Sequence, residues 1–123
     1  MYIFRKVLSI DPIVKILKKN KILNHDPLKD LHVTVALDDK TKRITMDRNI
    51  VKVDNIVSSD MFGIHRVFLL QSDYLQTRFE YYRTNGFKWN FDEYRPHISF
   101  SQQNERISFE PFSVLLGPEE VKL

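Results

Sequence analysis

Two short segments, residues 31–37 (LHVTVAL) and 97–101 (HISFS), limit most strictly what this chain can fold into. In each segment a histidine and a hydroxyl residue flank one apolar residue, within a run of β-branched or aromatic side chains. Side chains two positions apart in a β-strand point to the same face. Both segments therefore predict a strand with one apolar and one polar face, and the fold must bury both apolar faces.

The remaining pattern predicts an α+β domain with two main helices. The first helix starts at Asp11-Pro12, an N-cap followed by proline at the first helical position. The second starts at Ser72, a capping residue, and ends near Gly86, which suits a left-handed C-cap. Further strands are expected at residues 2–9, within 44–63 with a turn near 47–49, at 67–70, and at 109–116 before Gly117-Pro118.

The composition fits one domain over residues 1–123. Nine Phe, five Tyr and one Trp, with 42% hydrophobic residues, supply a core for a chain of this length. The absence of cysteine excludes disulfides, cysteine nucleophiles and thiolate metal sites, and fits a reducing compartment. A net charge of +3 is too small to predict binding of duplex nucleic acid. No stretch approaches the roughly 18 apolar residues of a membrane span, and the first ten residues lack secretory-signal features, so we expect a cytoplasmic protein.

The candidate catalytic residues are His32 with Thr34 and His97 with Ser99. If their strands are neighbours, two imidazoles and two hydroxyls share one small volume. One neutral imidazole can then accept a proton from an attacking hydroxyl or water, while the other, protonated, gives one to the leaving oxygen. The hydroxyls can donate to the non-bridging phosphate oxygens. The group fits metal-free cleavage of a phosphodiester, with the order of acid and base left open.

Other uses of the histidines are less consistent with the sequence. A packing role explains a single His-x-Thr strand well, but it does not explain a pair 65 residues apart. His25 and His65 lack a hydroxyl partner and are predicted to be surface residues. A zinc site would need His-x-x-x-His, cysteine, or a carboxylate at ligand spacing on the same strand face, and the sequence has none of these. No metal or other cofactor is therefore expected.

The two motifs resemble the signature of the 2H phosphoesterase superfamily, a pair of His-x-Thr/Ser motifs. Within it, the chain is most similar to the phage anti-CBASS 2H phosphoesterases, which degrade the cyclic oligonucleotide messengers of bacterial CBASS immunity. The similar stretches are DLHVTVAL, LLQSDYLQTRFEYYRTNGFKWNFDEYRPHISFS and LLGPEEVKL. The resemblance implies a bilobal, pseudo-symmetric α+β fold with antiparallel-rich sheets, two main helices and a central cleft.

The resemblance also implies a reaction and a substrate. The reaction is metal-independent cleavage of 3′–5′ bonds in cyclic di- or trinucleotides, with the adjacent ribose 2′-hydroxyl as nucleophile. In that family an aromatic and a basic residue of the first strand and a glutamate after the last strand hold the nucleotide, which implies Tyr2, Lys6 and Glu119 here. Trp89 and Tyr94, in the aromatic loop before the second motif, are candidates for stacking on the bases.

Several alternative functions stay open at this point. One is an RNA-end enzyme that opens 2′,3′-cyclic phosphates, or a relative that acts on small linear nucleotides. Another is a non-catalytic sponge that binds a cyclic nucleotide without turnover. A structural role in a virion is a third, which no feature of the sequence favours.

Overall fold

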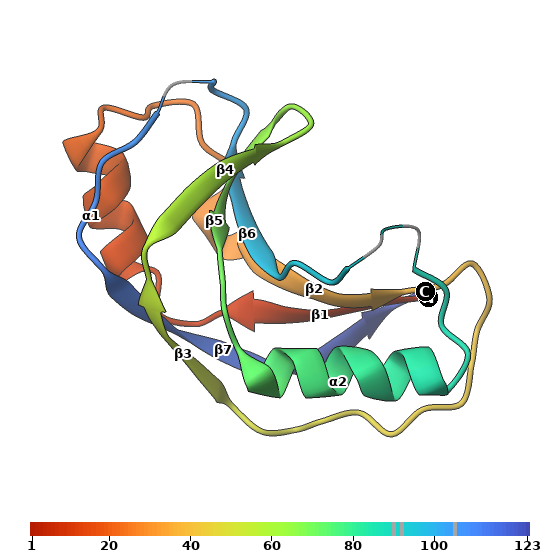
Figure 1. Ribbon diagram of the computed structural model, residues 1–123. Coiled ribbons are helices and arrows are strands. Elements are labelled where there is room, and N and C mark those ends of the chain that lie inside the picture. The colour runs from red at the N-terminus through yellow and green to blue at the C-terminus, as the bar shows by residue number, and fades with distance from the viewer. Residues whose placement is uncertain (90, 92, 105) are drawn as a thin grey trace.

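The computed structural model describes residues 1–89, 91, 93–104 and 106–123, which form an α+β fold of two α-helices and a curled antiparallel sheet (Figure 1). The predicted α+β class is confirmed. In chain order the elements are β1 (Tyr2–Val7), α1 (Asp11–Lys19), the short 3-10 helix η1 (Leu28–Asp30), β2 (His32–Leu37), β3 (Val51–Ile56), β4 (Ser58–Phe62), β5 (His65–Leu69), α2 (Asp73–Thr84), β6 (His97–Ser101) and β7 (Phe112–Lys122).

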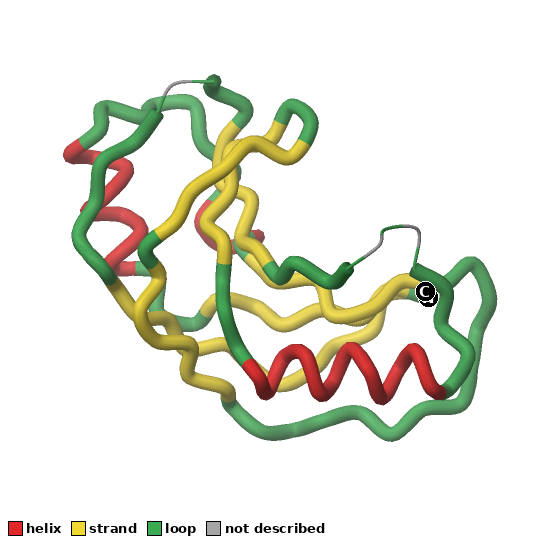
Figure 2. Tube along the Cα trace, in the orientation of Figure 1, coloured by secondary structure: helices red, strands yellow, loops and turns green. Residues whose placement is uncertain are grey.

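The sheet curls because its two edge strands are consecutive in the chain. The strand order is β3-β7-β1-β2-β6-β5-β4, so β3 and β4 lie at opposite edges although only Val57 separates them. Such a link brings one end of each edge together, and the sheet bends round to allow it (Figure 2). Asn55, at the end of β3, adopts a left-handed φ of 55°, a conformation that asparagine tolerates and that turns the chain here.

The two strands that meet in the middle of the sheet, β2 and β6, are paired over the shortest length. β2 and β6 share one residue pair, Val33 with Ile98, whereas β1 pairs over five positions with β2 and over five with β7. We call the β2–β6 contact the seam. Val33 and Ile98 are fully buried, so the apolar faces of both motif strands point into the core, as predicted. The residues on either side of this pair share the opposite face of the sheet, the motif face.

Both helices bury their apolar stripes in the same core as the seam. Ile13 and Leu17 of α1, and Leu75 and Phe79 of α2, belong to the cluster that contains the buried seam residues. The predicted cap of α2 is confirmed, because the Ser72 hydroxyl accepts a hydrogen bond of 3.2 Å from the amide of the third residue after it. None of the described helices is long and apolar enough to cross a membrane.

The first helix and the third strand begin differently from the prediction. Ile10, not Asp11, is the N-cap of α1, and no side chain caps this helix; Asp11 lies in its first turn. The strand predicted to start at residue 44 starts only at Val51. The segment before it makes a backbone bond to β7, from the Glu119 amide to the Asp47 carbonyl, and also bonds to the buried side chains of Arg5 and Glu119. The second helix ends as predicted, with φ at +91° in Gly86.

The last strand continues through the predicted stop at Gly117-Pro118. These two residues lie opposite the single residue Lys6, where the β1–β7 register shifts as in a β-bulge. Proline lacks an amide hydrogen and is tolerated where the ladder is interrupted. The bulge also changes the phase of β7: Leu116 faces the core before it and Glu119 faces the core after it. Every residue beyond the bulge therefore faces the side opposite to that expected from simple alternation.

A buried ion-pair network fixes α2 to the sheet. Arg5 and Glu119 oppose each other on β1 and β7, and both side chains are fully buried. Glu119 accepts hydrogen bonds from Arg78 of α2 (2.8 and 2.9 Å) and from the Tyr82 hydroxyl (2.5 Å). Burial and the bond to Glu119 raise the pKa of Tyr82, which stays a donor at neutral pH. Arg5 also pairs with Asp47, so the network holds the segment before β3 as well.

We expect Glu119→Ala to lower the free energy of unfolding by about 3–5 kcal/mol, because it leaves Arg5 and Arg78 without their buried partner. The matched control is Glu120→Ala, which removes a neighbouring carboxylate that is 42% exposed and should change stability by less than about 0.5 kcal/mol. Urea unfolding followed by circular dichroism measures both. Equal losses in the two variants would show that the buried network does not stabilise the fold.

Candidate functional site

The register of the seam brings the two sequence motifs together. In this antiparallel pairing His32 lies beside Ser99, and Thr34 lies beside His97, on the motif face. All four side chains are half-buried, so they are partly shielded from water and still open to a ligand. The neighbouring position of the two motif strands, on which the predicted chemistry depends, is thus present in the structure.

Both imidazole rings are oriented by a hydrogen bond from Nδ1 to a backbone carbonyl oxygen. Nδ1 of His32 lies 2.7 Å from the carbonyl oxygen of Asp30, and Nδ1 of His97 lies 2.9 Å from that of Arg95. Each carbonyl belongs to the residue two positions earlier, and a carbonyl only accepts hydrogen bonds. Nδ1 therefore carries the hydrogen in both rings, and Nε2 is the atom of each neutral ring that can take up a proton.

Aromatic residues of β1 surround the first histidine. The Tyr2 hydroxyl lies 2.5 Å from Nε2 of His32 and 2.9 Å from Oγ1 of Thr34. Burial raises the pKa of Tyr2, more than the bond to Thr34 lowers it, so the phenol is protonated at neutral pH. The Phe4 ring stacks on Tyr2 with the centroids 5.3 Å apart and meets the His32 ring edge-on at 5.8 Å. Tyr2 thus lies beside both residues of the first motif.

Charged side chains extend the motif face beyond β1. Lys6 is opposite His32 in the β1–β2 register, and its ammonium lies 3.6 Å from the Glu120 carboxylate. The predicted role of Glu119 in holding a nucleotide is contradicted, because this side chain is fully buried in the network on the other side of the sheet. The phase change at the bulge makes Glu120, which is opposite Phe4, the carboxylate of the motif face.

The second histidine has an aromatic and cationic neighbourhood. The ring of His97 meets the Phe62 ring edge-on at 4.5 Å, and the Arg95 guanidinium lies 4.8 Å from the centre of the same phenyl ring. Arg95 also pairs with Asp60 at 3.5 Å. Burial is the main cause that lowers the pKa of His97 below its ordinary 6.5; repulsion from His32 and Arg95 adds to it, and the bond to the Arg95 carbonyl opposes it. His97 is therefore neutral at pH 7.

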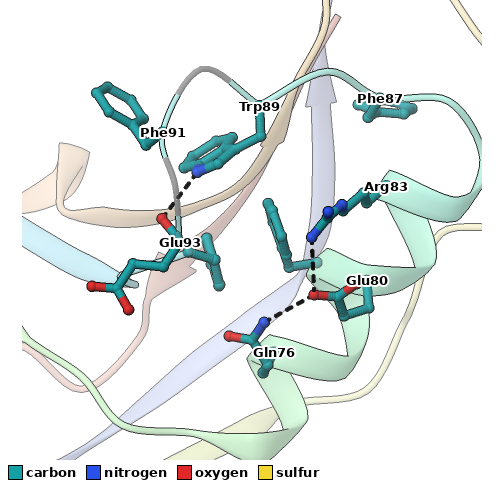
Figure 3. Close-up of a pocket in the computed structure, with 9 residues that line it drawn as sticks. Gln76, Glu80, Arg83, Phe87, Trp89, Phe91 and Glu93 are labelled. Atoms are coloured by element: carbon teal, nitrogen blue, oxygen red, sulfur yellow. Dashed lines mark hydrogen bonds and ion pairs between the residues drawn. The ribbon is translucent and has the colours of Figure 1, made fainter.

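Two hollows flank the loop before β6. The larger, of about 700 Å³, opens beside His97 and has the size of a small-ligand site. The smaller, of about 350 Å³, lies between the loop and α2, where Gln76, Glu80 and Arg83 form its polar side (Figure 3). Trp89 lines both hollows and is half-buried, so part of its side chain is open to a ligand beside His97.

Tyr94 is a core residue, which contradicts its predicted role in base stacking. It is 7% exposed, and its ring stacks on Phe79 of α2 with the centroids 4.4 Å apart and the planes at 3°. Burial raises the pKa of its hydroxyl, which donates a hydrogen bond of 2.6 Å to the backbone carbonyl of Thr34. Tyr94 therefore supports the first motif from the core side of β2.

Three further residues, Phe4, Arg95 and Phe62, surround the motif histidines, and the sequence carries a signal for the first two. Strand alternation places Phe4 on the same face as Tyr2, and it places Arg95, two residues before His97, beside the second motif. Phe62 reaches His97 from the β4–β5 hairpin, and no local signal predicts that contact.

The other two histidines lie outside this group. His25 and His65, which the sequence predicted to be surface residues, are half-buried and therefore keep part of their side chains exposed. Nδ1 of His25 lies 2.8 Å from the Asp26 carbonyl oxygen. In the part of the chain that the structure describes, no group of three or more His, Asp or Glu side chains is placed to hold a metal ion.

Because burial is the main cause of the lowered pKa of His97, Phe62→Ala should raise this pKa toward 6.5. Titration of the imidazole carbon-bound protons by NMR measures the change. The control is Ile64→Ala, which removes a 64%-exposed side chain from the same hairpin and should leave the His97 titration unchanged. An unchanged midpoint in Phe62→Ala would show that the phenyl ring does not shield this imidazole.

Comparison with known families completes the description of the site. The family model described as anti-CBASS protein Acb1 matches residues 1–122, a range that contains both histidine motifs and the larger hollow. A search among curated proteins finds no match. The family description gives the role as opposition to CBASS, and the match extends over nearly the whole chain. The chain therefore belongs to the anti-CBASS protein Acb1 family.

Proposed function

We propose that the protein is a metal-independent phosphodiesterase that cleaves 3′–5′ bonds of cyclic oligonucleotide messengers. In this proposal it is a phage protein that acts in the host cytoplasm and removes the signal of CBASS immunity. One observation carries the proposal: two imidazole Nε2 atoms and two hydroxyls project from one narrow seam of the sheet. Membership in an anti-CBASS family supports a cyclic oligonucleotide as the ligand.

The chemistry follows from what the four side chains can exchange with a phosphodiester. One Nε2 accepts the proton of the ribose 2′-hydroxyl while the 2′-oxygen forms a bond to phosphorus. The bond from phosphorus to the 5′-oxygen breaks, and the other Nε2 gives that oxygen a proton. The hydroxyls of Thr34 and Ser99 donate to the non-bridging oxygens as negative charge builds up on them. The products of this step are a 2′,3′-cyclic phosphate and a free 5′-hydroxyl.

The bilobal, pseudo-symmetric architecture of the 2H phosphoesterases is part of the proposal. Nδ1 of each motif histidine donates to the carbonyl oxygen two residues earlier. Each ring also meets a phenyl ring edge-on: Phe4 of the adjacent strand β1 for His32, and Phe62 of β4, two strands away, for His97. The seam divides the sheet into a half with four strands and a half with three. Equivalent halves that meet at one phosphate would explain this repetition.

Charged and aromatic residues around the seam suit a compact anionic ring. Lys6 and Arg95 place one cation near each histidine, and each cation is held by a carboxylate that a phosphate can replace. Glu120, on the motif face, can accept hydrogen bonds from the amino group of a base. Trp89 at the larger hollow offers a stacking surface, worth about 1–3 kcal/mol for one base.

Substitution of either motif histidine should slow turnover strongly without loss of the fold. We expect His32→Ala and His97→Ala each to reduce cleavage of cyclic dinucleotides by about 10²–10⁴, because each removes one proton-transfer group. Mass spectrometry of the products, with EDTA present, measures cleavage, and circular dichroism checks folding. The matched control is His25→Gln, whose ring bonds to the Asp26 backbone and should leave activity unchanged.

Three outcomes contradict the proposal in different ways. No cleavage of any cyclic dinucleotide or trinucleotide by the unmodified protein, with binding retained, would identify a sponge. Preference for RNA ends with 2′,3′-cyclic phosphates would identify the RNA-end enzyme. Unfolding of both histidine variants would assign the motif a packing role.

A further inference from the structure

The two motif histidines have the same kind of hydrogen-bond partner at Nδ1, a backbone carbonyl, but they differ in their partners at Nε2. Nε2 of His32 lies 2.5 Å from the Tyr2 hydroxyl, which lies 2.9 Å from the hydroxyl of Thr34. In the described part of the chain, Nε2 of His97 has no hydrogen-bond partner, and its ring lies against the Phe62 ring. The pseudo-symmetric site is therefore asymmetric at the two atoms that would exchange protons.

The hydroxyl chain at His32 can run in either direction. When the imidazole is neutral, Thr34 donates to the Tyr2 oxygen and Tyr2 donates to Nε2. When the imidazole is protonated, Nε2–H donates to the Tyr2 oxygen and Tyr2 donates to Thr34. A hydroxyl is both donor and acceptor, so His32 keeps a partner in both protonation states. His97 has no such hydroxyl partner among the described residues. Its Nε2 is open to water, but burial of the ring still disfavours the charged form and lowers the pKa of His97.

We propose that His32 is the general acid and His97 the general base, and that Tyr2 is the positioning residue that fixes this order. The inference rests on the phosphodiesterase function proposed above and deepens it, because that function leaves the order open. Repulsion between two nearby imidazolium rings allows one proton at the pair, and the ring with the built-in acceptor takes it.

The charged groups around the two rings do not reverse this order. Lys6 of β1 is the register partner of His32, and its ammonium pairs with Glu120 of β7. The guanidinium of Arg95 lies near His97, and Asp60 of β4 pairs with it. His65 of β5 adds a weaker repulsion at His97. Each cation has its own carboxylate, so the hydroxyl chain is the main difference between the two sides.

The position of the Tyr2 oxygen also defines the path of the proton. This oxygen accepts Nε2–H of protonated His32 at the place where a leaving oxygen must lie. When substrate binds, the 5′-oxygen replaces it as the acceptor. Nε2 of His97 takes the 2′-hydroxyl proton, the 2′-oxygen bonds to phosphorus, the bond to the 5′-oxygen breaks, and that oxygen takes the proton from His32.

The order of protonation can be measured without any catalysis. Long-range ¹H–¹⁵N NMR of the full chain reports the protonation of each Nε2 as the pH is lowered. We expect His32 to gain its proton at a higher pH than His97, and Tyr2→Phe to bring the two titrations together. Tyr81→Phe removes a hydroxyl that bonds to the Thr45 amide and serves as the control. Protonation of His97 first, or no effect of Tyr2→Phe, would overturn the assignment.

A substrate with a good leaving group tests the catalytic order. A nucleoside 3′-(4-nitrophenyl phosphate) releases nitrophenolate, which needs no proton from an acid. With this probe His32→Gln should stay within about tenfold of the unmodified protein, while His97→Gln loses about 10² or more. Tyr2→Phe should lower kcat on a cyclic dinucleotide by a larger factor than it lowers kcat on this probe, because only the first reaction needs the proton from His32.

The two inferences fail in distinguishable ways. Rescue of His97→Gln in place of His32→Gln would reverse the acid and base while leaving the phosphodiesterase function intact. If the unmodified protein cleaves neither substrate, the proposed function fails, and with it the catalytic roles of the two histidines. The NMR titration still decides, in that case, which imidazole holds the proton.

Discussion

The Val33–Ile98 pair, which joins β2 to β6, is the constraint on which the rest of the site depends. Because both residues are fully buried, the residues before and after each of them turn to the motif face. One apolar contact thus fixes the position of two imidazoles and two hydroxyls. Lengthening the contact would flatten the sheet here, whereas a single pair allows its two halves to diverge around a ligand.

The core side of the sheet holds this narrow seam in place. The Tyr94 hydroxyl donates to the Thr34 carbonyl from the core side of β2, and the Tyr94 ring stacks on Phe79 of α2. The helix is attached to β1 and β7 by the buried pair of Arg5 and Glu119. The link of one residue between β3 and β4 bends the sheet. The core face of these strands therefore stabilises the fold, and the motif face carries the site. Glu119 lies on the core face and has a structural role, whereas its neighbour Glu120 lies on the motif face and is exposed.

Local pattern was sufficient to predict the motif strands, both helices and the faces of His32 and His97. It did not predict burial correctly where the alternation of inward and outward side chains shifts, or where a segment has no such alternation. The bulge at Gly117-Pro118 shifts the phase of β7, so Glu119 turns inward, and the aromatic loop has no period that could separate buried Tyr94 from half-buried Trp89. The strand order, and with it the approach of Phe62 to the second motif, depends on long-range pairing that no local pattern encodes.

A crystal structure with a 2′-deoxy cyclic dinucleotide tests the central claim most directly, because this ligand lacks the nucleophile and stays uncleaved. The quantity to measure is the distance from each motif Nε2 to the nearest oxygen of the bound phosphodiester. The expected result is one phosphodiester within hydrogen-bond reach of both His32 and His97, with the Tyr2 hydroxyl displaced. A phosphate out of reach of either ring, for example beside Arg83 in the hollow along α2, would contradict a shared site at the seam.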